Sequence, residues 1–300
     1  MSPHPVKIAY VTDRGFLRPT LVSLWSLLTH LGAPAELHVW GDGLGSQDWD
    51  AVDRVVAGHP DLTLHTRALN AAHLRQTRSA ATHISAATMG RLLLPRNVSG
   101  RVLYIDGDTL VTGDVAPVFN VDLQDAAAGI VRDFGVCHWL ADPGAAPADR
   151  GTRLPQIQHL LGEQPQSDYF NAGVMLLDCD AIRRDPALLA RIEDVAAASA
   201  HVQGDQDHLN QVLAGRVTQL DIGWNLSWGR LSRHRAYLRK LGLPMTGAAP
   251  GPARILHYHG PRKPWRDPRR DIWSSKGRAT WRYRRQLCRF AALYPDLVPE

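Results

Sequence analysis

Three short, continuously apolar segments alternate with two segments of helical periodicity in the first 70 residues. We expect strands at 7–13 (KIAYVTD), 36–43 (ELHVWGDG) and 62–69 (LTLHTRAL), with helices at 20–32 and 48–58. Strands that are apolar along their whole length, rather than on alternate residues, are buried on both faces. The alternation therefore predicts an α/β fold, with a Rossmann-like, mostly parallel sheet and helices on both faces.

The rest of the chain continues in the same pattern up to a basic C-terminal segment. Residues 141–168 are rich in Pro, Gly, Ala and polar side chains, and we expect a long loop or lid there. The other expected elements are a helix at 87–95, a strand at 101–106, a strand at 169–178, a helix at 186–199, a loop and helix at 204–215 and a last strand at 254–260.

Cysteine usage and the N-terminal sequence indicate the compartment. The three cysteines (Cys137, Cys179 and Cys288) are far apart in the chain and odd in number, which favours a reducing environment over a disulfide framework. The start of the chain reads as a first strand rather than a signal peptide, and no stretch approaches the ~18 consecutive apolar residues of a membrane span. We expect a cytoplasmic protein, and the high Ala and Arg usage is typical of a bacterial one.

The positive charge of the chain is concentrated near its end. Residues 262–289 hold eleven Lys and Arg against two Asp, interleaved with Trp and Tyr, while the rest of the chain is slightly acidic. This composition is compatible with contact with the inner face of an anionic membrane, with an acidic acceptor, or with a helix whose aromatic side chains pack on the body. Nucleic-acid binding is disfavoured because no recognition fold accompanies the basic segment. We predict a catalytic domain at 1–265 and a basic, aromatic, partly helical extension at 266–300.

Two aspartates follow the apolar segment 102–105 in YIDGDTLV (104–111). On a strand, Asp106 and Asp108 would face the same side, and open parallel sheets bind ligands at the carboxyl ends of their strands. Two carboxylates that share a site repel each other unless a cation lies between them, and Mg²⁺ or Mn²⁺ prefers such oxygen ligands. The tripeptide alone also fits a simple turn.

A second polar segment, HYHGPRKPW (257–265), ends the last expected strand. A neutral imidazole at His257 could complete a metal site with two carboxylates, and Lys263 could neutralise phosphate oxygens. Gly260, between them, would let the backbone approach a phosphate closely. We expect His259 on the opposite face of the strand, as a structural residue.

Four segments taken together carry a resemblance: YIDGDTLV, YFNAGVMLLD (169–178), GDQDHLN (204–210) and HYHGPRKPW. In this order and spacing the chain resembles the family 8 retaining glycosyltransferases, which include bacterial lipooligosaccharide galactosyltransferases and glycogenin. The resemblance covers residues 6 to about 265. It implies a GT-A fold, a UDP-sugar donor such as UDP-galactose or UDP-glucose, and Mn²⁺ or Mg²⁺ held by Asp106, Asp108 and His257.

The resemblance also implies roles for further residues. It places Gly260 and Lys263 at the diphosphate, and Gly107 beside the metal in the donor site. Donor contacts are implied for Val11, Thr12 and Asp13 at the uridine, and for Arg91 elsewhere on the donor. The residues implied around the transferred sugar are Asp133, Asn171, Ala172, Gly173, Asp205 and Gln206. Asp205 also suits a helix N-cap, and Asn171 and Asp133 suit turns at strand ends.

The resemblance implies transfer of galactose or glucose, with retention, to a hydroxyl acceptor such as a cell-surface glycan, a lipid-linked sugar or a natural product. Gln206 is the side chain expected beneath the anomeric carbon. A phosphatase of the haloacid dehalogenase class is disfavoured, because Leu110 stands where its motif needs Thr or Val. A non-catalytic protein of the same fold that binds nucleotide sugars or glycans stays open, as does a self-glucosylating primer.

Overall fold

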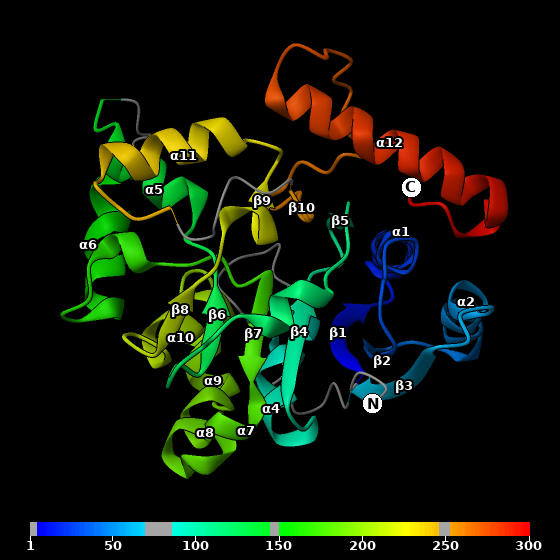
Figure 1. Ribbon diagram of the computed structural model, residues 1–300, viewed down its shortest axis with the longest axis horizontal. Helices are drawn as coiled ribbons and strands as arrows, with labels where there is room; N and C mark the ends of the chain where they lie inside the picture. The colour runs from blue at the N-terminus through cyan, green and yellow to red at the C-terminus, as the bar shows by residue number, and fades with distance from the viewer. Residues whose placement is uncertain (1–4, 70–85, 145–149, 246–252) are drawn as a thin grey trace.

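A mostly parallel sheet forms the centre of the protein, which we describe from a computed structural model covering residues 5–69, 86–144, 150–245 and 253–300 (Figure 1). Within these residues seven strands are ordered β3-β2-β1-β4-β7-β6-β8, with β7 antiparallel to both of its neighbours. The strands are β1 (Val6–Asp13), β2 (Ala35–Asp42), β3 (Leu62–Leu69), β4 (Arg101–Ile105), β6 (Ala128–Ile130), β7 (Val174–Asp178) and β8 (Val217–Gln219). The expected mostly parallel α/β sheet is confirmed.

Both faces of this sheet are covered at its central strands, as their apolar sequences predict, whereas the edge strand β3 is mostly exposed, contrary to expectation. In β4, Leu103 and Ile105 join a core with α1 (Leu17–Leu28) and α2 (Ser46–Val56). Val102 and Tyr104, which alternate with them, join a second core that includes Met89 and residues of the later helices. Successive side chains of a strand point to opposite faces. A strand buried on both faces therefore needs apolar residues in succession, and β4 has them from Val102 to Ile105.

A small second sheet stands beside the carboxyl end of β4. It has the order β5-β10-β9, from β5 (Thr109–Val111), β10 (Ile255–His257) and β9 (Leu226–Ser227). The strand expected at 254–260 is thus only three residues long. Residues 108–111 and 255–258 come together here although the sequence separates them widely, and the candidate site depends on this pairing.

The segment 141–168 differs from the expected loop. Within its described part the chain forms α6 (Arg150–Leu161) and a turn of 3₁₀-helix, η3 (Gln166–Asp168), while residues 145–149 lie outside the description. Ile157, Leu160 and Leu161 of α6 pack with Val136 and Tyr169 in a third core. Pro155 lies inside the helix and is the reason that the sequence pattern argued against one.

Two other expected helices have different boundaries. Residues 87–95 form a 3₁₀-helix, η1 (Ala86–Leu93), followed by α4 (Leu94–Asn97), and Pro95 opens that helix instead of ending it. Residues 186–199 form two helices, α8 (Pro186–Ile192) and α9 (Val195–Ala200), because Asp194 caps the second of them. The remaining elements are η2 (Ala116–Asn120), α5 (Phe134–Ala141), α7 (Cys179–Arg184), α10 (Asp205–Val212), η4 (Ile222–Asn225), α11 (Leu231–Lys240) and η5 (Pro295–Leu297).

The basic C-terminal segment contains α12 (Ser275–Leu293), which runs beside α1 (Figure 1). Phe290 meets Trp25 of α1 edge to face at 5.9 Å, and the buried Tyr283 meets Tyr258 at 5.3 Å. Part of the aromatic content therefore packs on the body, while Trp281 stays half exposed. Among the described residues, no helix combines the length and apolarity needed to cross a bilayer. The boundary at residue 265 stays a prediction.

Candidate functional site

The two aspartates of the YIDGDTLV segment lie in the turn between β4 and β5. Asp106 follows the last residue of β4, and Gly107 and Asp108 form a turn that leads into β5. The expectation that both aspartates continue a strand is therefore wrong, although their carboxylates still converge. A Cβ on Gly107 would lie 2.1 Å from Oγ1 of Thr20, so only glycine lets this turn approach α1 so closely.

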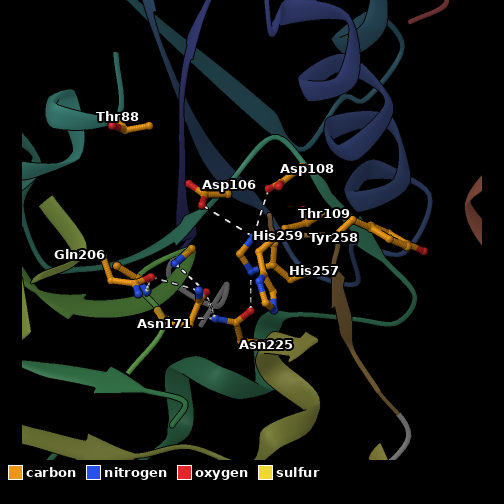
Figure 2. Close-up of polar contacts among 12 residues, drawn as sticks. Thr88, Asp106, Asp108, Thr109, Asn171, Gln206, Asn225, His257, Tyr258 and His259 are labelled. Atoms are coloured by element: carbon orange, nitrogen blue, oxygen red, sulfur yellow. Dashed lines mark hydrogen bonds and ion pairs between the residues drawn. The ribbon is translucent and has the colours of Figure 1, made fainter. Parts of the chain in front are cut away.

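His257 reaches the two carboxylates through strand pairing. It lies opposite Thr109 in the antiparallel β5–β10 pair and beside Ser227 of β9, while the backbone N–H of Tyr258 donates to the Asp108 carbonyl at 2.9 Å. Nε2 of His257 lies 3.1 Å from Oδ1 of Asp108 and 3.8 Å from Oδ2 of Asp106 (Figure 2). The three side chains present one ligand atom each within 4.8 Å of one another.

Asp108 is buried but surrounded by positive charge. Nζ of Lys263 lies 2.6 Å from Oδ2 of Asp108, opposite the side that faces His257. Burial by itself would raise the pKa of Asp108, but Lys263 and His257 outweigh burial and lower this pKa. Asp108 is therefore ionised in the folded protein. Its Oδ1 faces His257 and its Oδ2 binds Lys263.

Asp106 has a different environment. The Tyr104 hydroxyl donates to its Oδ1 at 2.5 Å, and the Arg91 guanidinium donates to the same oxygen at 3.2 Å. Burial raises the pKa of Asp106, and the nearby Asp108 charge adds to that, against the opposing effects of Arg91 and His257. A cation bound between Asp106 and Asp108 would remove this conflict, because it would favour the ionised form of both.

A chain of side-chain amides continues from His257 into the sheet (Figure 2). Nδ1 of His257 lies 2.9 Å from Oδ1 of Asn225, whose amide N–H donates to Oδ1 of Asn171 at 2.9 Å. Asn171 in turn donates to Oε1 of Gln206 at 3.0 Å, and the Ala172 backbone N–H donates to the same oxygen at 3.2 Å. The amide chain thus ties together three of the motif segments.

Gly173 lies directly against the converging carboxylates. A Cβ at this position would lie 2.2 Å from Cε1 of His257 and 2.6 Å from Oδ2 of Asp106. The Gly173 carbonyl also accepts from the Asp106 backbone N–H at 2.7 Å. The glycine in FNAG is therefore required by space, because any side chain there would push two candidate metal ligands apart.

Arg91 and Asp205 form a buried pair next to this group. Their side chains are 6% and 2% exposed, and Nε of Arg91 contacts Oδ2 of Asp205. Arg91 also donates to the Ala172 carbonyl at 2.7 Å, so it joins Asp205, Asp106 and the FNAG turn. The N-cap expected at Asp205 is not found, because Gly204 is the N-cap residue and Asp205 is the first residue of α10.

Asp133 does cap a helix. Its Oδ1 accepts from the Val136 backbone N–H at 2.9 Å at the start of α5. Burial raises the pKa of Asp133. The sequence suggested a turn at a strand end for Asp133, and the structure makes it a helix cap; its second carboxylate oxygen is not used by the cap.

The end of β1 lies at the same edge of the sheet as Asp106, because β1 and β4 are parallel neighbours. Thr12 Oγ1 lies 3.0 Å from Oγ1 of Thr20, the residue against which Gly107 packs, and Oδ1 of Asp13 accepts from the Phe16 N–H at 2.8 Å. Val11 is buried among the residues of the second core.

The 260–263 loop lies over this end of the sheet. Gly260 has φ +90°, which a residue with a side chain rarely adopts, and Nζ of Lys263 lies 5.6 Å from the centre of the Phe16 ring. All the residues expected at the site are thus distributed around one edge of the sheet.

His259 lies on the same side as His257, contrary to expectation. Their ring centroids are 5.2 Å apart, because positions two apart on an extended chain share a face. Nε2 of His259 is 2.6 Å from Oγ of Ser227, and burial lowers the pKa of His259 to about 3. It is therefore a neutral histidine that packs behind the candidate metal ligand.

Sequence reasoning missed two supports of the site. Asn225, in GWNLSWG, had no signal beyond a polar residue among apolar ones. Arg153 lies in the segment expected to be a loop, yet it is buried and contacts Asp207, while the Tyr169 hydroxyl donates to Oδ1 of Asp207 at 2.6 Å. Nε2 of Gln206 donates to that same hydroxyl at 3.0 Å, so α6 supports Gln206.

Comparisons with known proteins agree with this arrangement. The sequence profile of glycosyl transferase family 8 matches residues 7–268. Lipopolysaccharide glucosyltransferase WaaO of Escherichia coli is 24% identical over 267 residues, which cover 87% of this chain and 72% of WaaO. Probable galacturonosyltransferase-like 7 of Arabidopsis thaliana is 25% identical over 275 residues, which cover 88% and 71% of the two chains.

Solved structures agree as well. An active-site mutant of LgtC superimposes with a TM-score of 0.70 at 21% identity, over 95% of this chain and 96% of that one. The galactosyltransferase LgtC in complex with donor and acceptor sugar analogues has a TM-score of 0.68 at 20% identity, over 94% and 95% of the two chains. The fold is the GT-A fold of these structures, and the chain belongs to glycosyl transferase family 8.

Proposed function

We propose that this protein is a metal-dependent, retaining glycosyltransferase that transfers galactose or glucose from a UDP-sugar to a hydroxyl acceptor. The observation that carries the proposal is the convergence of Asp106, Asp108 and His257, with Lys263 on the outer oxygen of Asp108. Two carboxylates, an imidazole and a lysine are the groups needed to hold a divalent cation and the diphosphate of a nucleotide sugar.

The residues fit a divalent cation. Three ligand atoms already lie within 4.8 Å of one another, and Gly173 leaves the space beside them free of a side chain. A set of two carboxylates and one imidazole suits Mn²⁺ and also accepts Mg²⁺. When bound, such a cation supplies positive charge that offsets the charge developing on the departing diphosphate.

Lys263 and Gly260 are the groups we assign to the diphosphate. In the structure the Lys263 ammonium is held by Asp108, which is itself a candidate metal ligand, and Gly260, at φ +90°, places no side chain in the same loop. Val11, Thr12 and Asp13 at the end of β1 would hold the uridine, and Gly107 would contact the donor through its backbone, because Thr20 fills the space on its side-chain side. Arg91 would hold Asp106 and the FNAG turn in place as well as contact the donor.

The transferred sugar would lie among Asp133, Asn171, Ala172, Gly173, Asp205 and Gln206. Oε1 of Gln206 already accepts two hydrogen bonds, from Asn171 and from the Ala172 N–H, so it is poorly placed to attack carbon. We therefore assign Gln206 an electrostatic and positioning role beneath the anomeric carbon. Retention would follow from front-face attack, in which the acceptor oxygen bonds to the anomeric carbon as the diphosphate leaves and takes up the acceptor proton.

The cellular setting is proposed from the basic extension. Trp273 is 85% exposed and Trp281 is 52% exposed, and both lie among the arginines of residues 262–289. Aromatic side chains with basic neighbours favour the surface of an anionic membrane. We propose that the enzyme acts in the bacterial cytoplasm, at the inner face of the membrane, on a lipid-linked sugar or another cell-surface glycan precursor. Sedimentation with anionic but not neutral vesicles, lost in a Trp273→Ala, Trp281→Ala variant, tests this part.

The donor is tested by isothermal titration with UDP, UDP-glucose and UDP-galactose, with and without Mn²⁺. We expect Mn²⁺-dependent binding that disappears in Asp108→Ala and persists in Asp125→Ala, which removes an exposed aspartate elsewhere on the chain. Absence of UDP binding with Mn²⁺ present would refute the UDP-sugar assignment. If the protein binds UDP-glucose or UDP-galactose but releases no UDP from either, the non-catalytic alternative that only binds nucleotide sugars would instead be favoured.

A further inference from the structure

A second group of potential metal ligands lies on the outer strands of the main sheet. Glu36 and His38 stand two residues apart on β2 and therefore share a face, and His65 is the direct partner of His38 on the parallel strand β3. Among the described residues, this is the one other place besides Asp106, Asp108 and His257 where three potential ligand atoms lie within 4.8 Å of one another. Figure 1 shows β3 at the edge of the sheet.

The distances in this group are close to those around one bound ion. Oε2 of Glu36 lies 3.9 Å from Nε2 of His38 and 4.0 Å from Nε2 of His65. In the tetrahedral geometry of zinc, two ligand atoms bound at about 2.1 Å are separated by about 3.4 Å. Both measured distances exceed this separation by roughly half an ångström, so rotations about the side-chain bonds are needed to bring the three side chains onto one ion.

The Nε2 atom of His38 makes no hydrogen bond within the described residues. The His38 side chain is 12% exposed, and Nε2 itself is buried. A buried imidazole nitrogen with no partner is costly unless something binds it, and a metal ion is one of the partners that an imidazole nitrogen accepts.

Of the other two residues, His65 is exposed to solvent and Glu36 already has a charged partner. The His65 side chain is 47% exposed, and its ring stacks on His38 with centroids 4.7 Å apart and planes 12° apart. Because an ion lies in the plane of each imidazole that binds it, the exposed His65 ring has to turn out of this stack when the ion binds. Nζ of Lys7 lies 3.4 Å from Oε2 of Glu36 and donates to Oγ of Ser99 at 3.0 Å. Lys7 thus balances the Glu36 charge in the absence of an ion, and the exposed His65 leaves a route for an ion to enter.

This group is separate from the candidate donor site. In the parallel register, Lys7 of β1 pairs with both Glu36 of β2 and Val102 of β4. Glu36 is therefore level with Val102, four residues before Asp106, or about 13 Å along the strand direction at ~3.3 Å per residue. It also lies two strands away from β4, so the two groups cannot share one ion.

We propose that Glu36, His38 and His65 form a second metal site, which binds a divalent transition metal of the zinc class and fastens the edge strand β3 to β2. Two imidazoles and one carboxylate favour Zn²⁺, Ni²⁺ or Cu²⁺, whereas an oxygen-rich set such as Asp106 and Asp108 favours Mn²⁺ or Mg²⁺. Three protein ligands leave a coordination position for water. This proposal does not depend on the glycosyltransferase assignment, because zinc binding and UDP-sugar binding are measured in separate experiments.

The test is a count of tightly bound zinc per chain, by equilibrium dialysis of metal-stripped protein against Zn²⁺. We expect His65→Ala and Glu36→Gln each to bind one zinc ion fewer than wild type, with affinity at this site reduced by at least about tenfold. His159→Ala removes an exposed histidine of α6 and serves as the matched control. Asp108→Asn identifies any zinc held at the Asp106, Asp108 and His257 site. If the two sites are separate, the zinc lost in Asp108→Asn and the zinc lost in His65→Ala should add in the variant that carries both substitutions.

Thermal unfolding provides the second readout. Zn²⁺ should raise the Tm of Asp108→Asn and of Asp108→Asn, His159→Ala, but not that of Asp108→Asn, His65→Ala. A ligand that binds only the folded state stabilises it, and Asp108→Asn removes the contribution of zinc at the other site. Equal Tm values for His65→Ala and wild type without zinc would confirm that the variant folds. Unchanged zinc stoichiometry in His65→Ala and Glu36→Gln would overturn the proposal. So would a zinc-induced Tm rise in Asp108→Asn that persists when His65→Ala or Glu36→Gln is added.

Discussion

Nδ1 of His257 lies 2.9 Å from Oδ1 of Asn225, and this bond determines which ring nitrogen of His257 carries the free lone pair. The Asn225 amide N–H donates to the carbonyl and to Oδ1 of Asn171, at 3.2 and 2.9 Å, so its own Oδ1 is oriented to accept. His257 therefore carries its proton on Nδ1. Nε2 faces Asp108 at 3.1 Å, and it is the ring nitrogen left to bind a metal ion.

Replacing Asn225 should weaken the metal site without removing a ligand. In Asn225→Leu the His257 ring loses its acceptor, and we expect Mn²⁺-dependent UDP binding to weaken about 10- to 100-fold, as for other partners of metal-bound histidines. Asn225→Asp keeps an acceptor for Nδ1 and should retain affinity close to that of wild type. Titration calorimetry with Mn²⁺ and UDP measures both, and equal losses in the two variants would argue against control of the tautomer by Asn225.

Gly173→Ala should disable the site by displacement alone. The added Cβ would meet Cε1 of His257 at 2.2 Å and Oδ2 of Asp106 at 2.6 Å, so these side chains must move apart. We expect kcat/KM for sugar transfer to fall about 100-fold, the effect of a misplacement of about 1 Å, and stability to fall by about 1–3 kcal/mol. Gly151→Ala is the control, because nothing lies within 4 Å of a Cβ there. Wild-type kinetics in Gly173→Ala would show that sugar transfer does not require the present positions of His257 and Asp106.

Removal of Arg153 should lower the free energy of unfolding and displace Gln206, which Arg153 supports through Tyr169. Arg153→Leu leaves the Asp207 carboxylate, 1% exposed, buried without its cation, and such a loss costs about 3–5 kcal/mol. The paired variant Arg153→Leu, Asp207→Asn removes the buried charge as well and should recover part of that loss. Urea unfolding of the single and double variants measures the difference. Equal stabilities of both variants would mean that the buried ion pair is not the source of the effect.

His234 should make the protein less stable in acid. It is 1% exposed, it packs edge to face on Phe134, and burial lowers its pKa from 6.5 to about 4. Above pH 6.5 the ring is neutral in both the folded and the unfolded chain. As the pH falls below 6.5 the unfolded chain takes up a proton that the folded protein resists until about pH 4, so stability decreases through this window.

The size of this effect follows from the shift in pKa. His234 alone should account for a loss of about 3 kcal/mol by pH 4, at 1.36 kcal/mol per pKa unit. In His234→Leu the decline in unfolding free energy between pH 6.5 and pH 4 should be smaller by about this amount, while the stabilities of the two proteins at pH 8 provide the reference. A pH dependence identical to that of wild type would show that the pKa of His234 is the same in the folded and the unfolded chain.

Local sequence patterns determined much of this architecture. The buried strands β1, β2 and β4, the helices between them and the Asp106–Asp108 pair all appear where apolar runs and helical periodicity predict them. The same patterns failed at α6, because a proline and a glycine-rich neighbourhood argue against a helix when burial of Ile157 against Tyr169 cannot be seen. They also missed β5, which is too short to have a periodicity.

Only the tertiary structure decided how the site is assembled. The pairing of β10 with β5 brings His257 to Asp108 across almost 150 positions of sequence, and the orientation of Asn225 follows from contacts with Asn171. The register of β2 with β3 likewise places His38 beside His65. Periodicity reports whether a residue is buried, because burial depends on the local face of its own element. Which buried residues meet depends on strand order and register, which are set by the packing of the whole chain.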